Sequence, residues 1–297
     1  CGACPVPVSG PTAASICRPS PDLSLTHSPR QIRELLESGG LAPRRSLGQN
    51  FVADANTVRR IARLADVGAG DRVVEIGAGL GSLTLALAET GAQVTAVETD
   101  GGLAAVLRDV VADADRPVTV VQADARTVDW DEILDPAGSW TVVANLPYNI
   151  ATPLLLDLLD DVPQIERYLV MVQREAGERL VAAPGSKVYG VPSLKVAYRA
   201  TGELVGRIPP DVFVPRPKVE SVLVALQRRR EPPVDADEGV MFDLIRAGFQ
   251  QRRKMLRSAL KGRATVEQIE EAGLRPEARA AEVDLAGWAA LARRVAP

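Results

Sequence analysis

The sequence predicts an α/β fold, in which a parallel sheet is covered by helices on both faces, followed by a small C-terminal helical domain. Two observations predict it. Between residues 72 and 172, short runs rich in β-branched residues alternate with segments of helix length, an order typical of parallel sheets. Beyond residue 238 only helical patterns remain. The 297 residues, 46% hydrophobic and 25% charged, suffice for two globular domains at roughly 100–200 residues each.

The first ordered element is expected to follow an N-terminal extension. Residues 1–30 are rich in Pro, Ser, Thr, Ala and Gly and have no helical or strand periodicity, so we expect them to be disordered. Asp54 then precedes apolar residues spaced three and four apart up to Ala65, which predicts a capped amphipathic helix.

A strand–turn–helix–strand unit comes next. The run Arg72–Ile76 predicts a strand that ends at Gly77, Leu83–Ala88 has a helical pattern, and Gln93–Val97 repeats the strand signal. Three further runs predict strands of the same sheet, namely Val118–Val121, Thr141–Ala144 and Tyr168–Val172.

The last strands are expected to form an added antiparallel pair, Glu203–Ile208 with Ser221–Gln227. The proline-containing acidic stretch Glu231–Glu238 predicts a linker, and the residues after it have the pattern of three or four helices. We therefore place a domain boundary near residue 230, with one domain at 31–230 and a second at 231–297.

The sequence excludes several kinds of catalytic chemistry. The three cysteines, Cys1, Cys4 and Cys17, lie in the first seventeen residues, and His27 is the only histidine. A cysteine zinc site, a Ser-His-Asp triad or a histidine-rich metal site would lack its side chains in the folded domains, so we expect no metal. No apolar run reaches the roughly 18–20 residues that span a bilayer, and a signal-peptide pattern is absent. We expect a cytoplasmic protein without membrane contact.

Glycines follow the first strand of the unit in a pattern that suits a cofactor. Glu75–Gly81 has glycines at 77, 79 and 81, where glycine allows a tight turn and the close approach of a ligand. The dinucleotide fingerprint requires glycine at 82, and Ser82 favours S-adenosylmethionine instead. Glu98 ends the second strand, in position to bind ribose, and Asp124 follows the third, in position to read adenine. Glycine-rich turns also occur without ligands, so the prediction depends on Gly77, Glu98 and Asp124 following three successive strands.

The fourth strand leads into Asn145-Leu146-Pro147-Tyr148. An exocyclic adenine amine is a poor nucleophile because its lone pair is delocalised into the ring. The amide oxygen of Asn145 and the carbonyl of Leu146 are expected to accept its two hydrogens and free that lone pair. Pro147 would stiffen the turn, and Tyr148 would stack on the extruded base. A type I turn with a core tyrosine is the alternative for an isolated tetrapeptide of this kind.

The chain resembles the bacterial small-subunit rRNA adenine N6,N6-dimethyltransferases. The resemblance extends from about residue 44 to residue 260. Besides the two motifs above, the segments that carry it are Leu47–Phe51, Gln173–Leu180, Gly185–Gly190, Val214–Ser221 and Phe249–Lys254. Departures are Val52 where leucine is usual and Ala78 where proline is usual.

This resemblance implies a Rossmann-like class I methyltransferase sheet and S-adenosyl-L-methionine as methyl donor, without a metal. It implies a monomer that dimethylates the N6 amines of two adjacent adenosines near the 3′ end of 16S rRNA, with the maturing small ribosomal subunit as partner. The residues implied for cofactor binding are Asn50, Val52, Gly77, Glu98, Asp124 and Asn145, and those for catalysis are Asn145, Leu146, Pro147 and Tyr148.

Two other functions remain open. Large-subunit rRNA adenine methyltransferases of the macrolide-resistance type share the cofactor loop and the tetrapeptide, but usually have isoleucine at the position of Leu146. The Gly185–Gly190 block resembles the small-subunit enzymes better. A ribosome-assembly or transcription factor would keep the fold as a binding module without turnover, and the intact Asn145 and Tyr148 argue against it.

Charge is unevenly distributed along a chain whose formal net charge is −3. Residues 64–135 carry 14 acidic and 4 basic residues, net −10, whereas Arg246–Arg263 carries seven basic residues and no acidic one. A helix from Phe249 to Lys261 would separate an apolar stripe from a basic face. Unbalanced like charges favour an anionic partner over a solvated face. The residues expected to bind RNA are Arg252, Arg253, Lys254, Arg257 and Lys261.

Overall fold

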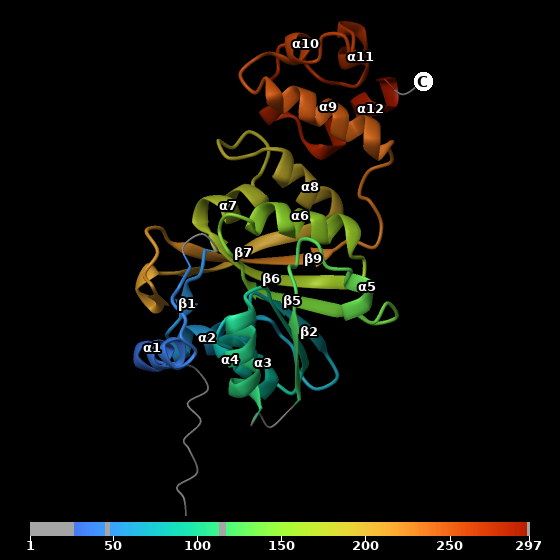
Figure 1. Ribbon diagram of the computed structural model, residues 1–297. Coiled ribbons are helices and arrows are strands. Elements are labelled where there is room, and N and C mark those ends of the chain that lie inside the picture. The colour runs from blue at the N-terminus through green and yellow to red at the C-terminus, as the bar shows by residue number, and fades with distance from the viewer. Residues whose placement is uncertain (1–26, 45–47, 113–116, 296–297) are drawn as a thin grey trace, which may run out of the picture.

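The computed structural model describes residues 27–44, 48–112 and 117–295. A sheet lies between helices, and the C-terminal helices form a group at the far end of the molecule from α1 (Pro29–Ser38; Figure 1). The predicted α/β class is confirmed. Most of the predicted extension, residues 1–26, lies outside the described residues.

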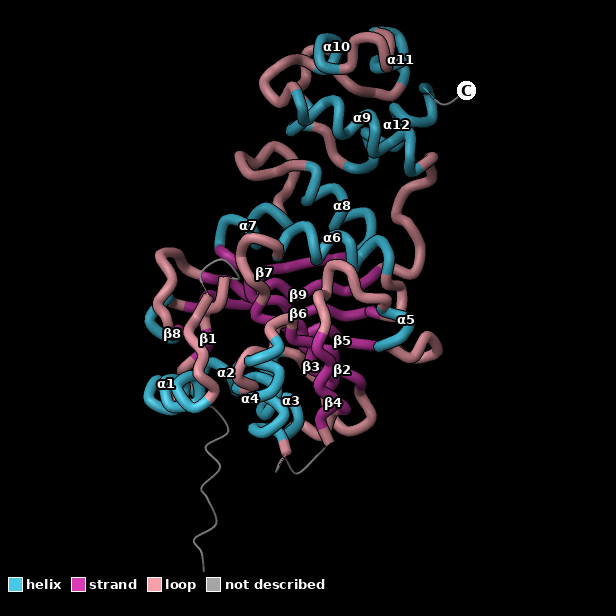
Figure 2. Tube along the Cα trace, in the orientation of Figure 1, coloured by secondary structure: helices cyan, strands magenta, loops and turns pink. Residues whose placement is uncertain are grey.

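The main sheet contains every strand that the sequence predicts. Its strands are β2 Arg72–Ile76, β3 Gln93–Glu98, β4 Val118–Gln122, β5 Trp140–Asn145, β6 Ile165–Gln173, β7 Ala200–Ile208 and β9 Ser221–Arg228. Their order is β4-β3-β2-β5-β6-β9-β7, drawn in magenta in Figure 2. The first five of these are parallel, whereas β9 is antiparallel to both β6 and β7, as predicted for the added pair. A separate antiparallel pair joins β1 Phe51–Val52 to β8 Phe213–Val214.

Helices pack against both faces of this sheet. Helices α2 (Ala55–Leu64) and α3 (Ser82–Glu89) share one apolar cluster with the sheet, and α6 (Ala151–Asp161), α7 (Arg174–Leu180) and α8 (Val191–Arg199) share the other. The predicted cap of α2 is present, because the Asp54 carboxylate accepts a hydrogen bond from the Thr57 amide at 2.7 Å. The remaining helices are α4 Gly101–Val111, α5 Trp130–Ile133, α9 Glu238–Gln250, α10 Leu256–Ala259, α11 Val266–Glu271 and α12 Leu285–Val295, with 3₁₀ turns η2 Pro210–Val212 and η3 Ala280–Glu282.

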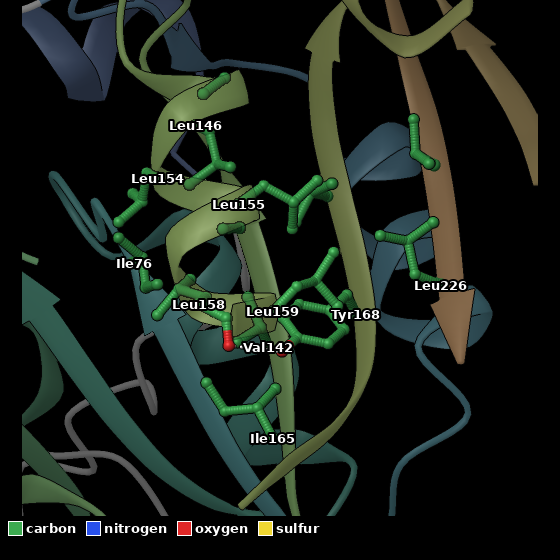
Figure 3. Close-up of a cluster of buried hydrophobic side chains, with 14 of the residues drawn as sticks. Ile76, Val142, Leu146, Leu154, Leu155, Leu158, Leu159, Ile165, Tyr168 and Leu226 are labelled. Carbon is green, nitrogen blue, oxygen red and sulfur yellow. Dashed lines mark hydrogen bonds between the residues drawn. The ribbon is translucent and has the colours of Figure 1, made fainter. Parts of the chain in front are cut away.

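The larger core lies between α6 and the middle of the sheet. Figure 3 shows leucines of α6, among them Leu155 and Leu159, facing Val142 of β5 and Tyr168 of β6. All four side chains are at most 2% exposed. At roughly 1.5–3 kcal/mol for each large apolar side chain removed from water, this layer supplies much of the stability that holds the strand ends in place.

Arg228, the last residue of β9, caps the C-terminus of α6 from within this core. Its guanidinium donates hydrogen bonds at 2.6–3.0 Å to four carbonyl oxygens, those of Leu158, Leu159, Val162 and Ile165. A fifth bond, of 2.9 Å, reaches the Tyr168 hydroxyl. The last carbonyls of a helix have no partner within it and carry partial negative charge, so a cation here satisfies both needs.

The N-terminal boundary predicted at residue 30 lies too late. Helix α1 begins at Pro29 with Ser28 as its cap, and His27 is only 8% exposed. The His27 ring donates from Nε2 to the carbonyl oxygen of Leu80 at 2.7 Å, and burial lowers its pKa. His27 therefore belongs to the folded domain, where it supports the glycine loop that follows β2.

Helix α8 joins the sheet domain to the C-terminal helices. Its Val196 lies in the core shared with α6, whereas Leu194 and Tyr198 lie in the core built by α9 to α12. Arg199 adds a polar link, because it pairs with Asp160 of α6 at 2.9 Å and with Glu238 at the start of α9. The division near residue 230 stays a prediction, and packing crosses it extensively.

The continuous helix expected from Phe249 to Lys261 is wrong. Helix α9 ends at Gln250, a turn follows, and α10 begins only at Leu256. The backbone amide of Leu256 donates to Ala278 at 2.7 Å and that of Arg257 to Pro276 at 3.1 Å, so these amides bind a neighbouring segment instead of continuing α9. Within the described part of the chain, the helices are too short or too polar to cross a bilayer.

Candidate active site

A pocket opens at the carboxyl edge of the parallel strands, where ligands of open α/β sheets bind. It lies among the ends of β2, β3 and β5 and the segment that contains β1. The residues that line it are Gly48, Gln49, Asn50, Phe51, Val52, Glu75, Gly77, Ala78, Gly79, Leu80, Ser82, Leu83, Glu98, Thr99, Leu103, Asn145 and Pro147. Five residues expected to bind a cofactor therefore meet in one place: Asn50, Val52, Gly77, Glu98 and Asn145.

The loop after β2 depends on its glycines. Gly77, Gly79 and Gly81 have φ values of 75°, 58° and 89°, a region that other residues rarely adopt. A Cβ at Gly79 would lie 3.0 Å from the Phe51 ring, and one at Gly81 would lie 2.7 Å from Leu107. The glycines therefore allow the backbone to turn between β2 and α3 while keeping the pocket open.

Glu98 holds the two sides of the pocket together. Its side chain is buried, and its carboxylate oxygens accept hydrogen bonds from the amides of Gly79 and Asp100, each at 2.9 Å. Burial raises its pKa, and these two bonds oppose that change. Each oxygen retains acceptor capacity, so Glu98 is able to bind a hydroxyl-bearing ligand as well as the loop.

Glu75 also lines the pocket, although the sequence pattern predicted only a strand residue there. Its carboxyl group is 2% exposed and accepts a hydrogen bond of 2.5 Å from the Thr84 hydroxyl. Burial raises its pKa to about 8, with the Thr84 bond acting in the opposite direction and Glu98 adding repulsion. The position of Glu75, two residues before Gly77, was the sequence feature that could have placed it in the pocket. The pattern of apolar and polar residues along a strand does not show how deeply a carboxyl group is buried.

Glu75→Gln is expected to stabilise the unliganded protein at pH 8 and to change little at pH 5. The folded protein keeps the Glu75 proton up to about pH 8, whereas the unfolded chain loses it near 4.5. Between these values the free energy of unfolding of the wild type falls by up to roughly 1.4 kcal/mol per pH unit, and glutamine removes this loss. Urea unfolding at the two pH values measures it. Glu132→Gln, at an exposed carboxyl, is the control, and an equal effect of Glu75→Gln at both pH values would contradict the expectation.

Asp124, also predicted to bind the cofactor, is not among the residues that line this pocket. Its carboxylate is held by the Arg126 guanidinium, with Nε 3.1 Å from Oδ1 and Nη2 2.6 Å from Oδ2. This pairing lowers the pKa of Asp124. Arg126, two residues further on, thus pairs with the carboxylate that was expected to read adenine, and that role stays a prediction.

Asn145 is oriented by the segment that closes the pocket. Its amide nitrogen donates to the carbonyl oxygen of Asn50 at 2.9 Å, and the Asn50 side chain in turn donates to Gly48 at 2.9 Å. The amide oxygen of Asn145 accepts no hydrogen bond from the described residues. It is therefore free to accept one from a ligand amine at the pocket rim.

The rest of the tetrapeptide forms a fixed turn beside the pocket. The Leu146 amide donates to Met171 of β6 at 3.1 Å, and the Pro147 carbonyl accepts from Ile150 and Ala151, at the start of α6. Leu146 is buried, whereas Tyr148 is partly exposed and lies outside the pocket lining. The turn is thus held by the sheet on one side and by α6 on the other.

The five expected RNA-binding residues differ in their surroundings. Arg252 turns inward and donates to the carbonyl oxygens of Tyr189 and Lys187, and Arg257 pairs with Glu277 at 3.3 Å. Both thus have structural partners. Arg253, Lys254 and Lys261 are exposed and form no ion pair with a described residue.

Comparison with known proteins identifies the family. Residues 40–296 match the family described as Ribosomal RNA adenine dimethylase. The chain is 48% identical to Ribosomal RNA small subunit methyltransferase A of Cutibacterium acnes, over 91% of this chain and 94% of the relative. It is also 48% identical to the protein of that name from Streptomyces coelicolor, over 92% and 98%.

Solved structures agree with this relationship. The 23S rRNA methyltransferase ErmE is 26% identical, with a TM-score of 0.65 over 83% of this chain and 100% of that one. A dimethyladenosine transferase from Plasmodium falciparum shares the fold, at 23% identity and a TM-score of 0.67 over 80% and 94%. The chain belongs to the ribosomal RNA adenine dimethylase family.

Proposed function

We propose that this chain transfers methyl groups from S-adenosylmethionine to the N6 amines of two adjacent adenosines near the 3′ end of small-subunit 16S rRNA. The observation that carries the proposal is the orientation of Asn145, whose amide nitrogen is held by Asn50 and whose oxygen is left for an amine. The small-subunit relatives, at 48% identity, are much closer than the 23S enzyme at 26%, which supports the small subunit as substrate. Because bacterial small subunits are assembled in the cytoplasm, we place the activity there.

The pocket suits S-adenosylmethionine in three respects. Glycines at 77 and 79 leave space where side chains would block it. Glu98 offers carboxylate oxygens to ribose hydroxyls. Val52, Leu83 and Leu103 add apolar surface. When bound, S-adenosylmethionine supplies a methyl group that is already activated by its sulfonium charge.

The residues around Asn145 are suited to activating the target amine. The Asn145 amide oxygen and the Leu146 carbonyl accept its two hydrogens, which draws the nitrogen towards a tetrahedral geometry and localises its lone pair. Fixed acceptors act better than mobile ones because no reorganisation is needed at the transition state. The bonds from Asn145 to Asn50 and from Leu146 to Met171 provide that fixation. Tyr148, partly exposed beside them, stacks on the extruded base.

The C-terminal helices contribute an electrostatic surface for RNA. Arg253, Lys254 and Lys261 are its proposed contacts, because they are exposed and are not paired with described acidic residues. Arg252 and Arg257 keep the loop at 186–189 and the segment around Glu277 in place, and thus support the surface indirectly. Such contacts position the enzyme on phosphates without reading sequence.

Changing Arg253, Lys254 and Lys261 together to Gln is expected to weaken small-subunit binding and to leave cofactor affinity unchanged. Each lost phosphate contact lowers the log–log salt slope by roughly 0.7–0.9. Binding measured over a salt series tests this. The matched control changes Arg246, Arg275 and Arg294, which pair with Asp243, Glu282 and Glu271, and removes the same charge. If both triple variants changed the slope equally, net charge rather than this surface would explain binding.

A methyl-transfer assay tests the function as a whole. Small subunits from a strain that lacks this modification, incubated with the protein and labelled S-adenosylmethionine, are expected to yield N6,N6-dimethyladenosine at two adjacent positions near the rRNA 3′ end. Large subunits are the control for the macrolide-resistance type of activity, and label there alone would replace the proposed substrate. Binding to small subunits without any methyl transfer would indicate an assembly factor instead.

A further inference from the structure

We propose that Ser221 is a positioning residue whose hydroxyl holds the ring of Tyr148 in the orientation that receives the target adenine. The proposal rests on the proposed function, in which Tyr148 stacks on that base. The Tyr148 hydroxyl and the Ser221 Oγ lie 2.7 Å apart, and either atom is able to donate. The hydrogen bond joins a loop residue of the tetrapeptide to the first residue of β9.

The two partners differ in how firmly the fold holds them. Ser221 is fully buried in the sheet and pairs with Gln173 of β6 on one side and with Ile208 of β7 on the other. Tyr148 lies in the turn between β5 and α6 and is partly exposed, although burial of its hydroxyl end raises its pKa. The sheet is therefore the fixed end of this contact, and the tyrosine ring is the end that it orients.

The chain just before Ser221 is also anchored. The Arg174 amide donates to the Glu220 carbonyl oxygen at 3.0 Å, and the Arg174 guanidinium pairs with the Glu220 carboxylate at 2.8 Å. Arg216 and Lys218, on the same connection, are exposed. The two contacts between Arg174 and Glu220 hold the backbone next to Ser221, so movement of the exposed connection is not passed on to the serine hydroxyl.

The bond gives the hydroxyl of Tyr148 a role that stacking alone does not require. Phenylalanine stacks on a base as well as tyrosine does, but its ring has no polar tether and is free to leave the stacking position. Ordering a free side chain when the substrate binds costs conformational entropy, which a ring ordered in advance avoids. We therefore expect Ser221 to affect capture and placement of the adenine, and not the binding of S-adenosylmethionine.

The test compares Ser221→Ala, Tyr148→Phe and the double variant in methyl transfer to undermethylated small subunits. Each single change removes the same hydrogen bond, so each is expected to lower kcat/KM for the subunit by roughly 3- to 10-fold, and the double variant no further. KM for S-adenosylmethionine stays unchanged. Ser193→Ala is the matched control, since it removes a buried serine hydroxyl contact elsewhere, to the Arg179 carbonyl oxygen.

The outcomes separate this inference from the proposed function. If Tyr148→Ala lowers transfer while Ser221→Ala and Tyr148→Phe behave like wild type, Tyr148 stacks without a tether and the inference is wrong. If the effects of the two single variants multiply, Ser221 acts on something other than the tyrosine hydroxyl, which also overturns it. If Tyr148→Ala has wild-type activity, it is the stacking step of the proposed function that fails.

Discussion

Asn145→Ala is expected to bind S-adenosylmethionine with an affinity within about threefold of wild type and to lose roughly 10²–10³-fold in kcat for methyl transfer. Its amide oxygen is one of two acceptors for the target amine, and an acceptor that acts mainly in the transition state contributes to kcat more than to ground-state binding. The variant loses the hydrogen bond to the Asn50 carbonyl oxygen. The segment around Asn50 is also held by the bond from the Asn50 side chain to Gly48 and by the β1–β8 pair, so the pocket is expected to keep its shape. Calorimetric titration and single-turnover assays measure the two quantities.

Asn149→Ala is the matched control, because it removes an exposed amide from the same turn. It is expected to retain near wild-type kcat. Wild-type turnover by Asn145→Ala would contradict the proposed mechanism. A loss of cofactor affinity as large as the loss in kcat would instead assign Asn145 mainly to holding the segment that closes the pocket.

Arg228→Met is expected to destabilise the protein by at least about 3 kcal/mol, because the removal of a hydrogen-bonded cation costs roughly 1.5–3 kcal/mol for a single bond and leaves buried carbonyls without partners. Methionine fills similar volume, so the loss reports on the five hydrogen bonds of the guanidinium rather than on a cavity. Urea unfolding at pH 7 measures it.

Arg229→Met serves as the comparison at the adjacent position. Arg229 donates one side-chain hydrogen bond, to the Ala197 carbonyl oxygen at 3.2 Å, so its loss is expected to cost about 1 kcal/mol. Similar destabilisation by both variants would mean that the cap on α6 contributes little beyond general charge removal at the end of β9.

The parallel strands and the residues at their ends were predictable from the sequence. A strand that is buried on both faces appears as a short run of consecutive apolar residues. Before Asn145 the run of β5 is apolar except for Thr141, and Asn145, which ends it, lies at the carboxyl edge because the strands are parallel. Helical amphipathicity and a cap at Asp54 located α2 in the same way. Local pattern was sufficient for these elements.

Contacts between distant segments were not predictable. The bond from His27 to Leu80 spans 53 residues, and the cap of Arg228 on Leu158 spans 70. Pairing of the amides of Leu256 and Arg257 with the segment at 276–278 interrupted a helix that local charge and hydrophobicity favoured. In each of these contacts, several groups elsewhere in the chain have the same hydrogen-bonding chemistry as the actual partner. Only the folded structure shows which of them lies close enough to bond.

Because α8 contributes side chains to two hydrophobic cores, the molecule is less modular than its linker suggests. A chain that ended near residue 230 would expose Leu194 and Tyr198 to water and leave Arg199 without Glu238. Exchange of the C-terminal helices between relatives would therefore require α8 to change with them. The C-terminal hydrophobic core thus begins at α8 and not at the linker.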